Sequence, residues 1–100
     1  MRTRLIEYRV HPDRIEDNER LVRDVFTELA QARLAGVSYR VLKGEGGRFV
    51  HLVSGETAPS PITQLAAFQR FQAGIRERCA VAPVTDEMTV IGDYASPPDA

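Results

Sequence analysis

Residues 37–55 read VSYRVLKGEGGRFVHLVSG, and this stretch decides the fold. Residues 37–43 alternate between apolar and polar side chains, which is typical of a half-buried strand. Residues 48–55 form a second and more apolar strand pattern, and the glycine-rich turn GEGG joins the two. The stretch therefore predicts a β-hairpin. One histidine, His51, lies in the middle of its second strand.

On the N-terminal side of the hairpin, the sequence predicts a strand and then a long helix. Residues 3–10 alternate in polarity, and the His-Pro pair that follows ends the strand, because proline cannot donate to a ladder. Asp13 is the expected N-cap of the helix, with Glu16 three residues later as in a capping box. Apolar residues then recur at helical spacing, and Gly36 is the expected stop.

On the C-terminal side, the sequence predicts a second helix and a last strand. Ser60 is the expected N-cap of this helix, and Pro61 suits its first position. Apolar residues recur at helical spacing as far as Cys79, and residues 81–83 are expected to break the helix. Residues 86–94, DEMTVIGDY, are the expected last strand.

The expected order of elements is strand, helix, strand, strand, helix, strand. Right-handed connections fold this order into a four-stranded antiparallel sheet with both helices on one face, the ferredoxin-like α+β arrangement βαββαβ. One hundred residues make one domain. We expect residues 1–95 to form this domain and residues 96–100 to be a disordered tail.

The composition excludes several classes of function. Thirteen Lys and Arg against fourteen Asp and Glu give a net charge of −1, whereas a nucleic-acid surface needs a concentrated basic face. The single cysteine fits a reducing compartment. No stretch has the ~20 apolar residues that span a bilayer, and the N-terminus lacks the apolar stretch of a signal peptide. We therefore expect a cytoplasmic protein with neither a nucleic acid nor a membrane as partner.

The second hairpin strand also predicts a partner. Its central residues, FVHLV, are apolar on both faces of the expected sheet, although the two helices cover only one face. A broad exposed apolar face is unusual in a soluble monomer. We expect a second copy of the chain to pack on it, sheet to sheet, in a two-fold homodimer. The alternative is a strand that exposes one or two apolar residues.

Three segments carry a family resemblance, and together they cover about residues 4–94: EYRVHPDRIEDNERLVRDVF, GVSYRVLKGEGGRFVHLVSGE and PITQLAAFQRFQAGIRERC. Their pattern resembles the dimeric α/β-barrel superfamily, in particular its antibiotic-biosynthesis-monooxygenase-like domains. The resemblance implies a homodimer with a semi-apolar pocket between each sheet and its helices. Some members oxidise polycyclic aromatic substrates with molecular oxygen and no cofactor. Others degrade haem or isomerise small metabolites.

The sequence departs from two branches of that superfamily. The haem-degrading and quinone-forming branches use a Trp just after the third strand, where this chain has Ser54, Gly55 and Glu56 and where no Trp is present in the whole sequence. The haem-degrading branch also uses an Asn in the first strand, but the only Asn here is Asn18, in the first helix. Haem degradation is therefore disfavoured.

His51 and Tyr39 are the candidate catalytic residues. If odd-numbered residues of the hairpin share one face, these two side chains lie together. A neutral imidazole there could take a proton from a phenolic or enolic substrate, and the tyrosine could hold the resulting oxyanion. A one-residue slip in register would instead put His51 beside Arg40 on the opposite face. The alternative role for His51 is that of a core or dimer-interface histidine with a satisfied partner.

Four aromatic residues are candidates for lining a pocket: Tyr8, Phe49, Phe68 and Phe71. The spacing of Phe68 and Phe71 is equally that of core residues on a helix. Cys79 has no acid or base placed beside it by the sequence, and a structural role is expected. No His, Cys and carboxylate set has metal-ligand spacing, so we expect no metal and no cofactor.

Two functions remain open at this point. One is a cofactor-independent monooxygenase-like or isomerase-like enzyme that acts on a small aromatic or enolisable metabolite. The other is a non-catalytic homodimer of the same fold that binds a small molecule or serves as an accessory protein. The resemblance favours the first. The absence of Trp and of a clear catalytic constellation favours the second.

Overall fold

The computed structural model describes residues 2–55 and 60–98. The end of the expected tail, residues 99–100, therefore lies outside the described residues. The elements follow one another in the expected order. They are β1 (Arg2–Val10), a 3-10 turn (Pro12–Arg14), α1 (Ile15–Ala32), β2 (Val37–Lys43), β3 (Arg48–Gly55), a second 3-10 turn (Pro61–Gln64), α2 (Ala66–Ala73), α3 (Ile75–Arg78) and β4 (Cys79–Met88).

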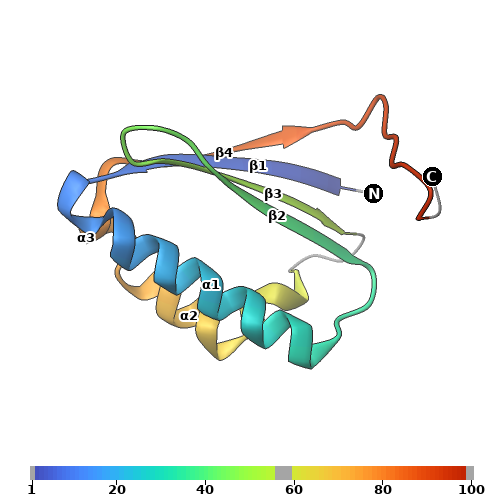
Figure 1. The fold of residues 1–100 in the computed structure, drawn as a ribbon, viewed down its shortest axis with the longest axis horizontal. Helices are drawn as coiled ribbons and strands as arrows, with labels where there is room; N and C mark the ends of the chain where they lie inside the picture. The colour runs from blue at the N-terminus through green and yellow to red at the C-terminus, as the bar shows by residue number, and fades with distance from the viewer. Residues whose placement is uncertain (1, 56–59, 99–100) are drawn as a thin grey trace.

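The four strands form one antiparallel sheet in the order β2-β3-β1-β4. Figure 1 shows α1 and α2 side by side beneath this sheet, both on the same face. The predicted ferredoxin-like α+β arrangement is therefore confirmed. Its opposite face is left without helices (Figure 1).

The register of the hairpin decides which face His51 occupies. Tyr39 pairs with Val53 and Val41 pairs with His51, so the odd-numbered residues of β2 and β3 share a face, which is the first of the two registers left open by the sequence. On the other side of β3, His51 is opposite Ile6. The alternative register with Arg40 beside His51 is excluded. His51 therefore lies on the face that the helices cover.

The capping box predicted for the first helix is wrong. Asp13 lies in the 3-10 turn, and α1 begins two residues later, with Arg14 at the N-cap position and no side-chain hydrogen bond there. The fixed backbone angle of Pro12 favours that tight turn. The helix ends before Gly36, because Arg33 adopts a left-handed conformation and its N–H bonds the Leu29 carbonyl.

The second helix is shorter than predicted, and the last strand begins earlier. The Ser60 hydroxyl accepts a hydrogen bond from the Ile62 N–H, as a cap does, but the turn that follows is 3-10 and α2 begins at Ala66. Residues 81–83 do not form a break: they belong to β4, which pairs along β1. Pro83 is tolerated because β4 is an edge strand.

Residues 89–98 form no strand, contrary to the predicted strand at 86–94. Two apolar residues of this extended segment are almost fully exposed, Ile91 at 98% and Tyr94 at 85%. The predicted strand begins seven residues too late because the helical pattern was extended through Cys79, where β4 already begins.

The core lies between the sheet and the helices. Its most deeply buried apolar residues come from β1, α1, β3 and α2: Tyr8, Val10, Val25, Phe49 and Ala67. Tyr8 stacks on Phe49 with ring centroids 5.7 Å apart, and Phe71 of α2 packs against Tyr8 at 6.2 Å. Burying such side chains contributes roughly 2 to 3 kcal/mol each.

The turn between β2 and β3 supports a test of the hairpin. A Cβ on Gly47 would lie 2.5 Å from the Val10 carbonyl oxygen, whereas a Cβ on Gly36 would meet nothing within 4 Å. Both glycines have positive φ, so Gly36→Ala should cost only the strain, about 1 to 2 kcal/mol. Gly47→Ala adds the backbone clash and should cost about 3 kcal/mol or more in urea unfolding. Equal losses in the two variants would contradict this close approach.

Candidate functional site

A cavity of about 320 Å³ opens between the sheet and the helices. It is bordered by side chains of β1, β2, β3 and β4, by the second 3-10 turn and by α2. Its lining includes five of the six residues singled out from the sequence: Tyr8, Tyr39, His51, Phe68 and Phe71. The sixth, Phe49, does not line it; this side chain is 1% exposed beneath Tyr8 and borders a separate surface hollow.

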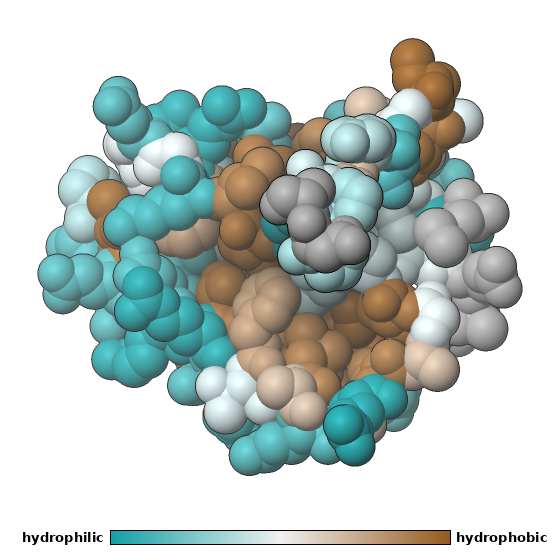
Figure 2. All heavy atoms as spheres, turned by 45° about the vertical axis from the view of Figure 1, so that its right-hand side comes forward, coloured by the Kyte–Doolittle hydropathy of each residue, from teal (hydrophilic) through white to brown (hydrophobic). Residues whose placement is uncertain are grey.

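The molecular surface includes an apolar hollow. In Figure 2, apolar side chains gather in a hollow at the centre of the face shown, and polar residues surround them. Most residues that line the cavity are apolar or aromatic, and Arg4 is the one charged residue among the described residues that line it. A cavity of this size and character suits a small, largely apolar molecule with a few polar atoms.

His51 is the centre of the cavity's polar groups. It is 4% exposed, and its two ring nitrogens bond two tyrosines. Nε2 lies 2.8 Å from the Tyr8 hydroxyl, and Nδ1 lies 2.7 Å from the Tyr39 hydroxyl. Tyr39 is only half-buried and stacks on Phe26 of α1. The register that sets Tyr39, His51 and Tyr8 on adjacent strands thus brings their polar ends together.

The hydrogen bonds continue from Tyr8 into the helices. The Asn18 amide donates to the Tyr8 hydroxyl at 2.9 Å, and the Arg78 Nε donates to the Asn18 carbonyl oxygen at 3.1 Å. Both residues are buried, at 0% and 2% exposed. We call the five connected residues the polar network: Arg78, Asn18, Tyr8, His51 and Tyr39.

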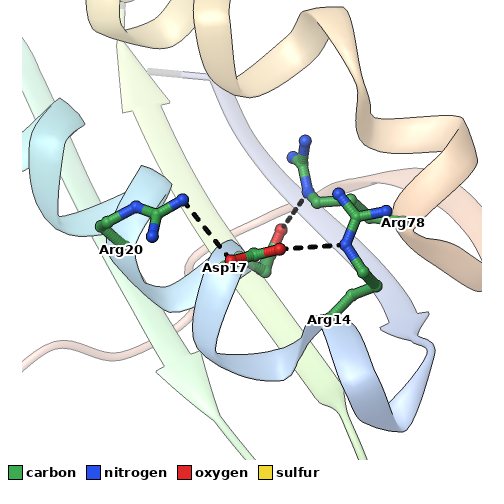
Figure 3. A network of polar contacts seen from close by, with 5 residues as sticks. Arg14, Asp17, Arg20 and Arg78 are labelled. Carbon is green, nitrogen blue, oxygen red and sulfur yellow. Dashed lines mark hydrogen bonds and ion pairs between the residues drawn. The ribbon is translucent and has the colours of Figure 1, made fainter.

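Arg78 is held without a direct carboxylate partner among the described residues. Its Nη2 donates to the Phe71 carbonyl at 2.7 Å, and its guanidinium lies over the Phe71 ring, 5.2 Å from the centroid. Asp17 is nearby on α1, but its carboxylate pairs with Arg14 and Arg20, as Figure 3 shows. The guanidinium therefore adds a buried positive charge at one end of the polar network.

Burial sets the protonation states of the network. It lowers the pKa of His51 to about 4, so the imidazole is neutral at pH 7. It raises the pKa of both Tyr8 and Tyr39, so both phenols keep their protons. The hydrogen bond from Asn18 opposes this rise at Tyr8, but burial has the larger effect.

Asn18 and Arg78 are the members that sequence reasoning missed. A signal for each was present. Asn18 lies three residues after Ile15 and four before Val22, so it occupies the apolar stripe of its helix. Arg78 lies three residues after Ile75 in the same way. A polar residue on a buried stripe needs a buried partner, and this is the pattern that could have identified both.

The remaining candidates have no chemical partner in the site. Cys79 is a free, partly buried thiol whose pKa is raised by burial. Within residues 2–55 and 60–98, no group of three His, Cys, Asp or Glu side chains could hold a metal ion. No helix in this part of the chain is long and apolar enough to cross a membrane.

The fold has close counterparts among solved structures. One named antibiotic biosynthesis monooxygenase superposes with a TM-score of 0.68 and 16% identity over 92% of this chain and all of that chain (100%). Rv0793 from Mycobacterium tuberculosis superposes with a TM-score of 0.74 and 13% identity, over 94% of this chain and 98% of that chain. PA3566 from Pseudomonas aeruginosa superposes with a TM-score of 0.71 and 18% identity, over 91% of this chain and 94% of that chain. The chain has the fold of the antibiotic biosynthesis monooxygenases.

At these identities the likeness concerns the fold alone. No family model matches the sequence, and no curated protein matches it either. Because one fold hosts many chemistries, the function has to be argued from the cavity and the polar network of this chain.

The depressed pKa of His51 predicts a pH dependence of stability. Between pH 6.5 and about 4 the unfolded chain binds a proton at this residue and the folded chain does not. The free energy of unfolding should therefore be fully retained above pH 6.5 and fall by up to about 1.4 kcal/mol per pH unit below it. Urea unfolding across this range measures the slope.

His51→Gln supplies the comparison, since glutamine does not titrate. This variant should be less stable at pH 7 but should show a shallower slope between pH 6.5 and 4.5. The exposed His11, replaced in the same way, serves as the matched control and should leave the slope of the wild type unchanged. A His51→Gln slope as steep as the wild type would show that the folded protein binds a proton at His51 as readily as the unfolded chain does in this pH range.

Proposed function

We propose that this chain binds a small aromatic or enolisable metabolite in the cavity and acts on it in cofactor-independent, monooxygenase-like or isomerase-like chemistry. The observation that carries the proposal is an apolar cavity whose wall holds the hydrogen-bonded pair of Tyr39 and His51. The fold shared with a protein named antibiotic biosynthesis monooxygenase supports the class of reaction. That name specifies no substrate.

The lining of the cavity supports an aromatic ligand. The ring centroids of Phe68 and Phe71 lie 6.0 Å apart, and those of His51 and Phe71 lie 5.4 Å apart, so aromatic rings cover much of one wall. Flat apolar molecules stack well on such surfaces. Tyr39 is the half-buried end of the polar network and therefore the hydroxyl best placed to reach an oxygen of the ligand. His51 fixes the position of that hydroxyl.

A binding protein without catalysis is the second candidate. Both ring nitrogens of His51 already bond a tyrosine, which is the arrangement of a satisfied buried histidine. In this case the polar network would only hold the ligand. Binding of aromatic compounds without turnover would favour this candidate.

We also propose that the chain is a homodimer through the helix-free face of the sheet. Four apolar residues of this face are about half exposed: Leu42, Val81, Val84 and Met88. One row of paired residues crosses all four strands of this face, in the order Leu42, Val50, Glu7 and Val84. Glu7 is neutralised there by Arg48, so the charge does not prevent a second sheet from packing on it.

Sedimentation at micromolar concentration tests the dimer. The wild type should sediment at about twice the chain mass of 11.2 kDa. Val84→Lys and Leu42→Lys place charges on the helix-free face and should give monomers. Ala30→Lys, on the exposed side of α1, should remain dimeric. A wild-type monomer would refute the proposed dimer.

A screen of aromatic compounds with an oxygen electrode tests the cavity and its chemistry. Gln72 of α2 is exposed at the rim of the cavity, so Gln72→Trp should fill the opening and abolish binding and oxygen uptake. Gln69→Trp, on the same helix but outside the lining, should retain both. Equal binding by the two variants would place the ligand elsewhere.

A further inference from the structure

We infer that the polar network is directional: it ends in a Tyr39 O–H that points into the cavity, and it selects an aromatic ligand with an anionic oxygen. This inference deepens the proposed function and rests on it for the cavity being the ligand site. It follows from counting which atoms of the network can donate hydrogen bonds and which can accept them.

The direction is set first at the buried arginine. A guanidinium can only donate, so the atom of Asn18 that faces the Arg78 Nε is the carbonyl oxygen. The other end of the same side chain is then the NH₂ group, and it faces the Tyr8 hydroxyl at 2.9 Å. Arg78 therefore fixes the orientation of the Asn18 amide, and Asn18 donates to Tyr8.

Tyr8 transmits this direction to the histidine. Its hydroxyl is buried in a residue that is 2% exposed, and its two described partners are the Asn18 NH₂ group and the His51 Nε2. The NH₂ group cannot accept, so the Tyr8 proton can be used only by Nε2. An unused buried donor is costly, which favours this single arrangement.

His51 then donates to Tyr39. Its neutral ring carries one proton, and because Nε2 accepts from Tyr8 that proton is on Nδ1. Nδ1 lies 2.7 Å from the Tyr39 hydroxyl, which accepts the bond. The proton of Tyr39 itself is left free for another acceptor. Tyr39 borders the cavity and two surface hollows beside α1, but of these three only the cavity is also lined by His51, which the Tyr39 hydroxyl bonds. His51 is in this arrangement a positioning residue that acts through Tyr39.

Charge determines which acceptor the cavity favours. The network contains the buried Arg78 cation, and the cavity wall contains Arg4. No Asp or Glu is among the described residues that line the cavity. Asp17, whose charge acts on Arg78, forms its ion pairs with two other arginines, Arg14 and Arg20. A negatively charged oxygen is thus favoured over a neutral one.

The matching ligand class is an aromatic phenolate or enolate. Its rings would pack on the phenylalanine wall, and its oxygen would accept the Tyr39 hydrogen bond. Such a ligand releases its proton to water before it enters the cavity, because neither ring nitrogen of His51 has a free lone pair to accept it.

Nitrogen NMR of the histidines tests the direction without any ligand. Long-range proton–nitrogen correlation should show His51 at pH 7 as the neutral form with its proton on Nδ1. Tyr8→Phe removes the donor to Nε2 and should reduce the preference for that form. His11, which is exposed, supplies the reference signals and is assigned from His11→Gln. A proton on Nε2 in the wild type would overturn the inference.

Two coumarin dyes test the ligand class. At a pH above the dye's phenol pKa, 7-hydroxycoumarin presents an anionic oxygen, whereas 7-methoxycoumarin presents a neutral one on the same two rings. The wild type should bind the anion at least about tenfold more tightly, the range expected for a hydrogen bond to a charged group. Tyr39→Phe should remove most of this preference and still bind the methoxy dye. Tyr94→Phe, on the exposed C-terminal segment, should behave as the wild type.

The outcomes separate this inference from the proposed function. If the wild type binds both dyes equally, or Tyr39→Phe keeps the preference, the directional network is refuted while the cavity remains a binding site for aromatic compounds. If neither dye binds at millimolar concentration, the binding function proposed for the cavity fails, and the inference fails with it.

Discussion

The hydrogen bonding of one buried imidazole constrains most of this structure. His51 loses its hydration on the covered face of the sheet, and it is tolerated there because two tyrosine hydroxyls satisfy its nitrogens. Those tyrosines lie on the strands to either side, so the satisfied state exists only in the observed register of β2, β3 and β1. A slip of one residue would leave the ring unpaired and turn it to the opposite face.

The helices supply the remaining hydrogen-bonding partners of the polar network. Tyr8 requires a donor as well as an acceptor, and Asn18 of α1 supplies it; Asn18 in turn is oriented by Arg78, at the end of α3. Polar contacts of this kind specify how the helices sit on the sheet more sharply than apolar packing does, since a displaced partner leaves a buried group unsatisfied. All buried side-chain polar atoms of the described residues have a partner.

This arrangement joins stability and the candidate function in the same residues. The inner hydrogen bonds of the network are satisfied within it, and three of its members line the cavity: Tyr8, His51 and the half-buried Tyr39. A cavity with apolar walls and one oriented donor requires little reorganisation when a ligand oxygen arrives, which is how fixed dipoles stabilise charge in buried sites. The helix-free face of the sheet is a separate surface with a separate proposed role, so changes there leave the cavity lining intact.

The sequence by itself determined the order of elements and the hairpin with its two strands, because period-two alternation and glycine turns are local signals. It left two registers open for the hairpin, and the strand pairing of the structure selected the one that puts Tyr39 and His51 on the same face. It misplaced the start of α1, the length of the second helix and β4, where strand pairing overrode local propensity. Only the tertiary structure joined Asn18, Tyr8 and Arg78 to His51. Asn18 is 10 positions from Tyr8, Tyr8 is 43 positions from His51, and Arg78 is 60 positions from Asn18. No local pattern encodes which buried polar groups will meet across the core.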